Sequence, residues 1–367
     1  MKIAEIFLQN WRNVAEIKFR PADAINIFLG ENAQGKTNIL ESINFASLLR
    51  SRAGKEEELI RWSKNVAIIR IKFLKFDISH ELAIEISPSK RRKIFFDANP
   101  IRPRELVGKL NSVLFSPEDL FMFKNSPSKR RKFLDAQISQ ASPVYFMDLL
   151  KYSRLIEIRN ALLKKIRNEQ ASETDLDLWD EQIALIEEKI IRKRLDSVKK
   201  LNFLANFIQQ QISLYKENLS VVYEMRGFNS TENICVNFLN SLRERRFKDI
   251  KRGSTSIGAH LDDIKFFING RELKIFGSQG QIRTTALALK LSELKFLKSE
   301  TGEYPILLLD DVMSELDAKR RELLLDFLQK EEIQTLITAT DREYFPKNSF
   351  GKFFLVKSGE ISEGAIF

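Results

Sequence analysis

The sequence feature that most constrains the fold is a phosphate-binding loop near the start of the chain. Residues 30–37, Gly-Glu-Asn-Ala-Gln-Gly-Lys-Thr, match the pattern G-x-x-x-x-G-K-[ST] in full. The short apolar segment 24–29 precedes the loop and predicts a strand, and apolar residues at helical spacing follow it as far as Leu48. Because this strand–loop–helix order is the context in which the motif binds nucleotides, we expect a nucleotide-binding domain of the α/β class.

Each part of this loop has a physical role in holding a nucleotide. Gly30 and Gly35 let the backbone curl, so that successive N–H groups face phosphate oxygens beside a helix N-terminus. Lys36 places a compact positive charge at the β- and γ-phosphates of ATP, and the Thr37 hydroxyl is a ligand for Mg²⁺. The loop residues expected to bind the nucleotide are Gly30, Glu31, Asn32, Ala33, Gln34, Gly35, Lys36, Thr37 and Asn38.

A second segment supplies the carboxylates that such a loop requires. Residues 304–311 are Tyr-Pro-Ile-Leu-Leu-Leu-Asp-Asp, and their apolar run predicts a strand that is buried on both faces. Acidic residues at the C-terminal end of such a strand lie where α/β proteins bind their ligands. Asp310 is expected to hold Mg²⁺, and Asp311 to orient or deprotonate the attacking water. The alternative is an acid pair that is merely solvated at the strand end.

A third motif lies in sequence between these two. Residues 277–281 are Gly-Ser-Gln-Gly-Gln, and a helical pattern follows them. A serine and a glycine at a helix start offer a hydroxyl, a backbone N–H and the helix dipole to an anion. The segment resembles the signature motif of ABC-type ATPases, and residues 314–317, Ser-Glu-Leu-Asp, resemble the D-loop of the same superfamily. The four residues 278–281 alone are a weak indication of this motif. Their place between the phosphate-binding loop and the two carboxylates makes the indication specific.

The middle of the chain differs in character from both ends. After Ser142-Pro143 it is rich in Leu, Ile, Lys, Glu and Arg, and apolar residues at three-, four- and seven-residue spacing predict two long helices with a bend near Ala171-Ser172. β-Branched residues and turn signals between 66 and 96 predict antiparallel strands. We therefore expect a discontinuous head with a mixed sheet, residues 1–142 plus 251–367, and an inserted helical lobe, residues 143–250. Irregular heptads favour a helical bundle over a coiled-coil arm.

Composition narrows the partners and the compartment. Sixty Lys and Arg residues against fifty Asp and Glu give a net charge of +10, which favours a polyanionic partner, either nucleic acid or an anionic membrane surface. With one cysteine and two histidines, metal sites built on those residues are excluded and any metal needs oxygen ligands. No signal-type segment opens the chain and no apolar run reaches the ~18 residues that span a bilayer. A cytoplasmic protein without a membrane partner is expected.

Together these motifs resemble the RecF family of bacterial recombination mediators, which is related to the SMC and Rad50 heads. The resemblance implies a P-loop ABC-type ATPase head with antiparallel strands and an inserted helical lobe. It also implies a weak ATP hydrolase that binds DNA, dimerises on ATP, and acts with RecO- and RecR-like proteins at gapped DNA to help load RecA. The matching segments are residues 10–13, 30–38, 58–62, 115–120, 126–135, 277–281, 307–311 and 314–317.

The resemblance assigns roles to further residues. Those expected at the nucleotide are Arg12 and Asn13 from the same protomer, and Ser278, Gly280 and Gln281 from the opposite protomer. The basic tract Lys129-Arg130-Arg131-Lys132 is expected to contact DNA phosphates, which give affinity without sequence information. A solvated charged face is the default alternative for any single basic cluster.

Two stretches depart from the family pattern. Residues 258–263, Gly-Ala-His-Leu-Asp-Asp, lack the proline and arginine of the family motif, and Arg50–Gly54 lacks its histidine. These departures leave details of DNA and nucleotide contact open without affecting the ATPase core. A Q-loop glutamine is not evident, and Glu118 or Asp119 stands near its place. Thr340 occupies the position at which transporter ATPases carry a switch histidine.

Two other classes of protein share the phosphate-site motifs. A nucleotide-binding subunit of a transporter is disfavoured by the missing switch histidine, the positive net charge and the large helical insertion. A long-armed SMC-type structural ATPase needs far more coiled-coil sequence than residues 143–250 provide. A pull-down with nucleotide separates the classes, because the first hypothesis predicts DNA and a RecR-like protein whereas a transporter subunit predicts a membrane permease.

Overall fold

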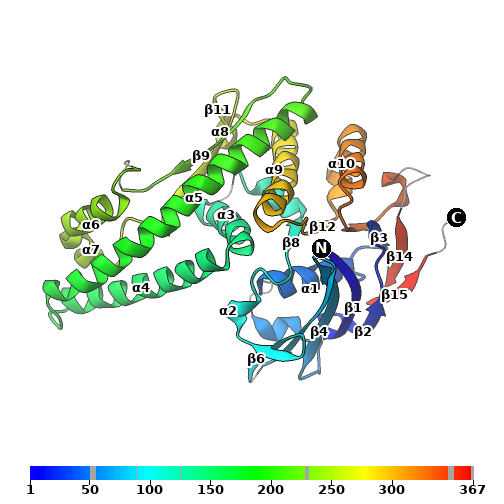
Figure 1. Ribbon diagram of the computed structural model, residues 1–367, viewed down its shortest axis with the longest axis horizontal. Coiled ribbons are helices and arrows are strands. Elements are labelled where there is room, and N and C mark those ends of the chain that lie inside the picture. Colours follow the sequence, from blue (N-terminus) through cyan, green and yellow to red (C-terminus); the bar gives the residue numbers. More distant parts are fainter. Residues whose placement is uncertain (50–54, 89, 125, 228–230, 346–350, 365–367) are drawn as a thin grey trace. The chain divides into compact units, whose positions relative to one another are not determined.

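The computed structural model describes residues 1–49, 55–88, 90–124, 126–227, 231–345 and 351–364 (Figure 1). The altered stretch Arg50–Gly54 lies outside these residues. Backbone contacts divide the chain into two compact units. The first unit comprises Met1–Phe121, Gln211–Leu214 and Ile282–Phe367, and the second comprises Met122–Gln210 and Tyr215–Gln281. The second unit thus contains most of the segment 143–250 together with flanking segments on both sides.

The first unit begins with a six-stranded antiparallel sheet in the order β2-β1-β4-β5-β6-β7. Buried and exposed residues alternate along β4, as the two-residue period of an extended chain requires when one face is covered. The antiparallel strands predicted between 66 and 96 are confirmed. The strands are β1 (Lys2–Trp11), β2 (Val14–Phe19), β4 (Ala67–Lys75), β5 (Ile78–Ser87), β6 (Lys90–Phe96) and β7 (Asn99–Ile101).

The second sheet of this unit has the order β15-β14-β3-β13-β12-β8 and is parallel except for the β14–β15 pair. Its central strands β12 and β13 are buried along their whole length, which is why they are mostly apolar. Since β3, β13 and β12 are parallel, their carboxyl ends lie at one edge of the sheet. The strands are β3 (Ile25–Leu29), β8 (Ser112–Phe115), β12 (Ile306–Asp310), β13 (Thr335–Ala339), β14 (Lys352–Lys357) and β15 (Glu360–Glu363).

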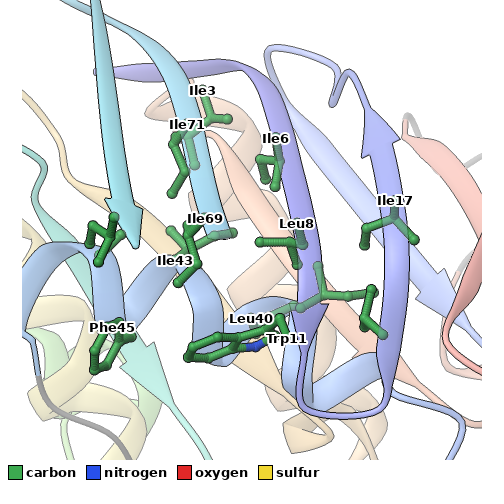
Figure 2. Close-up of a cluster of buried hydrophobic side chains, with 14 of the residues drawn as sticks. Ile3, Ile6, Leu8, Trp11, Ile17, Leu40, Ile43, Phe45, Ile69 and Ile71 are labelled. Atoms are coloured by element: carbon green, nitrogen blue, oxygen red, sulfur yellow. The ribbon is translucent and has the colours of Figure 1, made fainter. Parts of the chain in front are cut away.

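Helix α1 (Lys36–Leu48) contacts strands of both sheets and carries much of the core of the first unit. Figure 2 shows Leu40, Ile43 and Phe45 of this helix beside side chains of β1 and β4. The ring centroids of Trp11 and Phe45 are 5.5 Å apart, and Trp11 Nε1 donates a 2.8 Å hydrogen bond to the Asn38 carbonyl. The core thereby fixes the start of α1, where the phosphate-binding loop ends.

Short helical segments and two longer helices complete the first unit. Helix α9 (Gln279–Thr301) begins in the second unit and continues in the first from Ile282. The predicted α/β head with a mixed set of parallel and antiparallel strands is confirmed. The other helices are η1 (Glu56–Leu59), α2 (Pro103–Leu106), η2 (Pro117–Phe121), η4 (Val312–Glu315), α10 (Ala318–Lys330) and η5 (Arg342–Tyr344).

The second unit is built on two long helices, α4 (Pro143–Arg167) and α5 (Leu176–Ile212). Both were expected, and Ser142 caps α4 by accepting a hydrogen bond from the Tyr145 N–H at 3.3 Å. The unit is not wholly helical, because β9 (Leu219–Glu224), which the sequence analysis missed, pairs with β10 (Asp263–Ile268). The remaining elements are α3 (Pro127–Ala141), η3 (Glu173–Asp175), α6 (Ile234–Glu244), α7 (Arg246–Arg252), β11 (Arg271–Glu272) and α8 (Leu273–Phe276).

Candidate nucleotide-binding site

The predicted phosphate-binding loop connects β3 to α1, as the sequence pattern requires. Gly35 has φ +108°, a conformation that side chains strain to adopt, and a Cβ at this position would lie 2.9 Å from the Asn13 side-chain amide. A Cβ at Gly30 would overlap the backbone carbonyl of Val356. Both glycines are therefore needed for the close approach of neighbouring segments as well as for the curl of the loop.

Lys36 is held inside the loop rather than extended into solvent. Its Nζ donates hydrogen bonds to the carbonyls of Gly30 and, at 2.8 Å, Glu31. The side chain is nearly buried, and burial lowers the pKa of Lys36 while the negative charges of Asp311 and Asp310 oppose that shift. The ammonium group thus lies at the centre of the backbone curl, which is the position that a lysine must occupy to meet phosphate oxygens.

Thr37 and Asp310, the two residues expected to hold Mg²⁺, lie within hydrogen-bonding distance of each other. Thr37 Oγ1 donates to Asp310 Oδ1 at 2.8 Å. The hydroxyl of buried Thr338, on β13, donates to the same oxygen at 3.0 Å and accepts from the Asp311 N–H at 2.9 Å. A hydroxyl and a carboxylate are the oxygen ligands that Mg²⁺ prefers, so the residues fit the ion. The sequence analysis missed Thr338, because a threonine in a buried strand carries no distinctive pattern.

Asp311 lies next to Asp310 but in a different environment. Its backbone is left-handed, with φ +53°, and its Oδ1 is buried with no hydrogen-bond partner among the residues described. Burial raises the pKa of Asp311, and Asp310 and Glu315 raise it further while Lys36 opposes the shift. A carboxylate with raised basicity beside the phosphate loop is suited to hold a water molecule or to accept its proton.

A pocket joins the loop to these groups. It is lined by residues 31–38 together with Asp311 and Thr338. Within the described ranges, no group of three or more His, Cys, Asp or Glu side chains is placed to hold a metal ion. A site of one carboxylate and one hydroxyl matches the way Mg²⁺ is usually bound with nucleotides, since phosphate oxygens and water complete its coordination.

Arg12 and Asn13 occupy the turn between β1 and β2, beside the loop. Asn13 Oδ1 accepts a 2.7 Å hydrogen bond from Asn38 Nδ2. The Asn13 amide also lies close to Gly35, so Asn13 is near both the end of the loop and the first turn of α1. Arg12 has φ +52° and donates to Glu41 Oε1 on α1 at 2.7 Å. Asn13 thus lies at the predicted site, whereas the Arg12 guanidinium is bound to the flank of α1.

The signature residues form the first turn of α9. Ser278 Oγ accepts a hydrogen bond from the Gln281 N–H at 3.2 Å, and Gln281 Oε1 accepts one from the Ser278 N–H at 3.1 Å. This reciprocal pair is a capping box, and it accounts for the helix start without any ligand. Ser278 and Gly280 are nevertheless exposed, and with Gln281 they belong to the second unit. The first turn of α9 is thus accessible from solvent at Ser278.

The D-loop motif lies directly after Asp311. Ser314 Oγ donates to the Asp311 carbonyl at 2.8 Å, and Asp317 caps α10 by accepting from the Arg320 N–H at 2.9 Å. Glu315 forms a 2.9 Å ion pair with Arg283 on α9. The motif thus fixes the backbone that follows the two carboxylates.

Asp119, one of the two residues near the Q-loop position, and Thr340, at the switch-histidine position, differ in exposure. Asp119 forms a 3.5 Å ion pair with buried Lys290 and accepts from the Ser116 N–H at 2.8 Å, so its carboxylate has a structural role. Thr340 is exposed just beyond the end of β13. Neither residue lines the pocket described above.

The basic tract on α3 is divided between exposed and buried residues. Arg130 is 3% exposed, and its guanidinium donates to both oxygens of Asp263, at 2.8 and 2.7 Å. The prediction that Arg130 contacts DNA is therefore wrong for this structure, because its charge is buried and paired. Arg131 is half-buried and donates to the Asp262 carbonyl at 2.6 Å. Lys129 and Lys132 are the exposed members of the tract.

In the ranges that the structure describes, no helix combines the length and the apolar character needed to cross a bilayer.

Comparison with protein families gives a match to the RecF/RecN/SMC N-terminal domain over residues 2–360. The SMC head domain of Pyrococcus furiosus, bound to the C-terminal domain of ScpA, has a TM-score of 0.59 at 16% identity and shares the fold.

Full-length relatives give the same family. The DNA replication and repair protein RecF of Halothermothrix orenii is 41% identical over 99% of both chains, and that of Alkaliphilus oremlandii is 39% identical over 98% of this chain and all of the other. A solved structure of the recombination mediator protein RecF with ATP is 36% identical and has a TM-score of 0.91, covering 99% of this chain and 98% of the other. This chain belongs to the RecF family.

Proposed function

We propose that this chain is an ATP-dependent DNA-binding recombination mediator of replication and repair. In this proposal it dimerises on ATP and acts with RecO- and RecR-like partners at gapped DNA to promote the loading of RecA. Its ATP hydrolysis is weak and serves as a switch. The relatives named as DNA replication and repair proteins, and the RecF–ATP structure assigned to the RecFOR pathway, support this class of function.

The observation that carries the proposal is one pocket lined by Lys36, Thr37 and Asp311, with Asp310 hydrogen-bonded to Thr37 beside it. We assign the β- and γ-phosphates of ATP to the loop, with Lys36 as their counter-charge. Thr37 and Asp310 are the proposed ligands of Mg²⁺, which supplies charge neutralisation at the phosphates when bound. Asp311, the carboxylate with the raised pKa, is the proposed acceptor of the proton from the attacking water.

The proposed dimer follows from the exposed first turn of α9. This turn, with the exposed Ser278 hydroxyl, belongs to the second unit, whereas the phosphate loop lies in the first unit. If Ser278 of one protomer binds the γ-phosphate held in the loop of the other, two-fold symmetry gives two equivalent sites. ADP lacks this phosphate and therefore does not hold the dimer. Lys129 and Lys132 are the proposed contacts to DNA phosphates.

Sedimentation with a non-hydrolysable ATP analogue tests the role of Ser278. The wild-type chain is expected to dimerise with the analogue and to remain monomeric with ADP. Ser278→Asp is the sharpest variant, because aspartate caps a helix as well as serine does but places a negative charge where the phosphate must approach. We expect it, like Ser278→Arg, to bind ATP as a monomer with near-normal affinity and not to hydrolyse it.

Ser172→Asp is the matched control. Ser172 is an exposed serine that forms the same kind of capping box at η3, with Asp175 as its partner. It should dimerise as the wild type does. If Ser278→Asp also dimerises with the analogue, the motif serves only to start α9 and the proposed dimer is wrong. A nucleotide-dependent pull-down distinguishes the remaining classes, since recovery of a membrane permease instead of DNA would favour a transporter subunit.

A further inference from the structure

The short helix α7 has two faces with opposite electrostatic character. On the inner face, Arg246 donates to Asp177 at 2.5 Å and Asp180 at 2.8 Å, and Asp249 accepts from Arg159 of α4 at 2.9 Å. These charges are paired within the second unit. The outer face, in contrast, is basic and aromatic. Its exposed residues are Phe247, Lys248, Lys251 and Arg252.

Two bases of α4 lie beside the C-terminal end of α7. Gly253 ends α7 with φ +72°, and a Cβ there would lie 3.1 Å from Lys164 Cγ and 3.3 Å from Arg167 Nη1. The side chains of Lys164 and Arg167 therefore lie against Gly253, which directly follows Lys251 and Arg252 in the chain. Figure 1 places α7 near the end of the helical pair formed by α4 and α5. Two helices thus contribute to one surface.

None of the five bases on this surface forms an ion pair with an acidic side chain of the described residues, whereas the neighbouring Arg243 does, at 3.8 Å from Glu181. Bases in the last turn of a helix are favoured by its dipole, which accounts for part of the charge without any ligand. It does not account for Phe247, which is 80% exposed although most large aromatic side chains are buried. An exposed aromatic ring among unpaired bases therefore indicates a ligand.

We propose that Phe247, Lys248, Lys251 and Arg252, with Lys164 and Arg167, form a binding surface for a single-stranded segment of DNA. The bases contact phosphates, and the Phe247 ring stacks on an unpaired base, the combination typical of single-strand binding without sequence preference. A duplex hides its base faces, so the ring selects a gap or an end. The inference rests on the proposed function for its class of partner, but not on the ATP site or on Lys129 and Lys132.

Fluorescence anisotropy with a labelled oligo-dT tests the charges on the full-length chain. Lys251→Glu/Arg252→Glu and Lys164→Glu/Arg167→Glu should each weaken binding about 10-fold or more near 0.1 M salt. The negative slope of log K against log[salt] should become less steep by about 1.4, because each phosphate contact on a single strand contributes about 0.7. Lys189→Glu/Lys199→Glu changes the net charge equally at exposed positions of α5 and is the control. It should keep the wild-type slope.

Phe247→Ala tests stacking separately from charge. Because the ring is exposed, its removal should leave the fold intact, and it should weaken oligo-dT binding about 5-fold or more without changing the salt slope. Phe247→Trp should restore the affinity. An abasic oligonucleotide of equal length should bind the wild type and Phe247→Ala equally, since it has phosphates but no base to stack.

The outcomes separate this surface from the proposed function. If the charge variants bind oligo-dT as tightly as Lys189→Glu/Lys199→Glu, the proposed DNA-binding surface is refuted, even if ATP-dependent dimerisation is intact. Loss of a protein partner with unchanged oligonucleotide affinity would overturn it in favour of a protein surface. If the surface variants lose DNA while Ser278→Asp still dimerises, the surface stands and the proposed dimer fails. Wild-type protein that binds no oligo-dT, with or without ATP, contradicts the surface whatever its oligomeric state.

Discussion

Replacing Glu187 by glutamine should stabilise the protein, and more so as the pH rises. Glu187 lies on α5 and is fully buried. Its Oε1 accepts a 2.8 Å hydrogen bond from the Ala259 N–H, whereas Oε2 has no partner among the described residues. Burial, with the nearby negative charge of Asp262, raises the pKa of Glu187 to about 8. The side chain is therefore protonated in the folded protein at neutral pH.

The sign of the effect follows from proton binding. Between the unfolded value near 4.5 and the folded value near 8, the folded state holds a proton that the unfolded state has released. Stability therefore falls as the pH rises through this window. At 1.36 kcal/mol per pH unit, the loss is about 1 kcal/mol at pH 5, about 3 kcal/mol at pH 7 and about 4 kcal/mol at pH 8.

Glutamine reproduces the shape of the protonated acid but cannot ionise in either state. Glu187→Gln should therefore gain about 1 kcal/mol of unfolding free energy at pH 5 and about 3 kcal/mol at pH 7. Urea unfolding at four pH values, followed by circular dichroism, measures the difference. Glu244→Gln, at an exposed glutamate of α6, is the control and should show no such trend. A difference between Glu187→Gln and wild type that does not change with pH would refute the reasoning.

Three further predictions concern the nucleotide site and the basic tract. Lys36→Met should weaken ATP binding about 10-fold or more in a calorimetric titration, because it removes the charge within the loop. Unchanged affinity would contradict the assignment of the ATP phosphates to this loop. Asp311→Asn should keep ATP binding and slow hydrolysis about 100-fold in a phosphate-release assay. Arg130→Ala should lose about 3 kcal/mol of unfolding free energy, because it leaves Asp263 without its partner. Lys129→Ala/Lys132→Ala should keep that stability and weaken DNA binding; equal stability of both variants contradicts the assignment.

The nucleotide pocket could be predicted from sequence because its parts are local. Gly35, Lys36 and Thr37 follow one another at a strand–helix junction, and Asp310 ends an apolar run that predicts a buried strand. Parallel pairing of β3, β13 and β12 then brings these residues to one sheet edge. The long helices α4 and α5 were predictable for a similar reason, since their apolar spacing extends over many turns.

What the sequence did not reveal depends on contacts between distant residues. Arg130 has three basic neighbours in sequence, yet it pairs with Asp263, 133 residues away. A tract of four bases on a helix cannot all face one way, because successive side chains are about 100° apart. β9 was missed because it lies after a long helix and its antiparallel partner, β10, is far along the chain. Such pairings leave no local pattern.

Thr338 is the residue of the site that most needs a test, since its single hydroxyl bonds both aspartates. It donates to Asp310 Oδ1 and accepts from the Asp311 N–H, so it fixes the side chain of one aspartate and the backbone of the other. Thr338→Val keeps the shape but leaves the buried Asp311 N–H unsatisfied, which costs about 1–3 kcal/mol.

Beyond that loss of stability, Thr338→Val should raise the Mg²⁺ concentration needed for half-maximal hydrolysis, because Asp310 Oδ1 then loses one of the two hydroxyls that donate to it. Thr335→Val is the matched control: Thr335 is buried in the same strand, and its hydroxyl donates to the Ile333 carbonyl at 3.0 Å. Both variants lose a buried hydroxyl, but that of Thr338 bonds Asp310 Oδ1 and the Asp311 N–H, whereas that of Thr335 bonds a backbone carbonyl. An equal Mg²⁺ requirement in the two variants would mean that Thr338 stabilises β13 without positioning the aspartates.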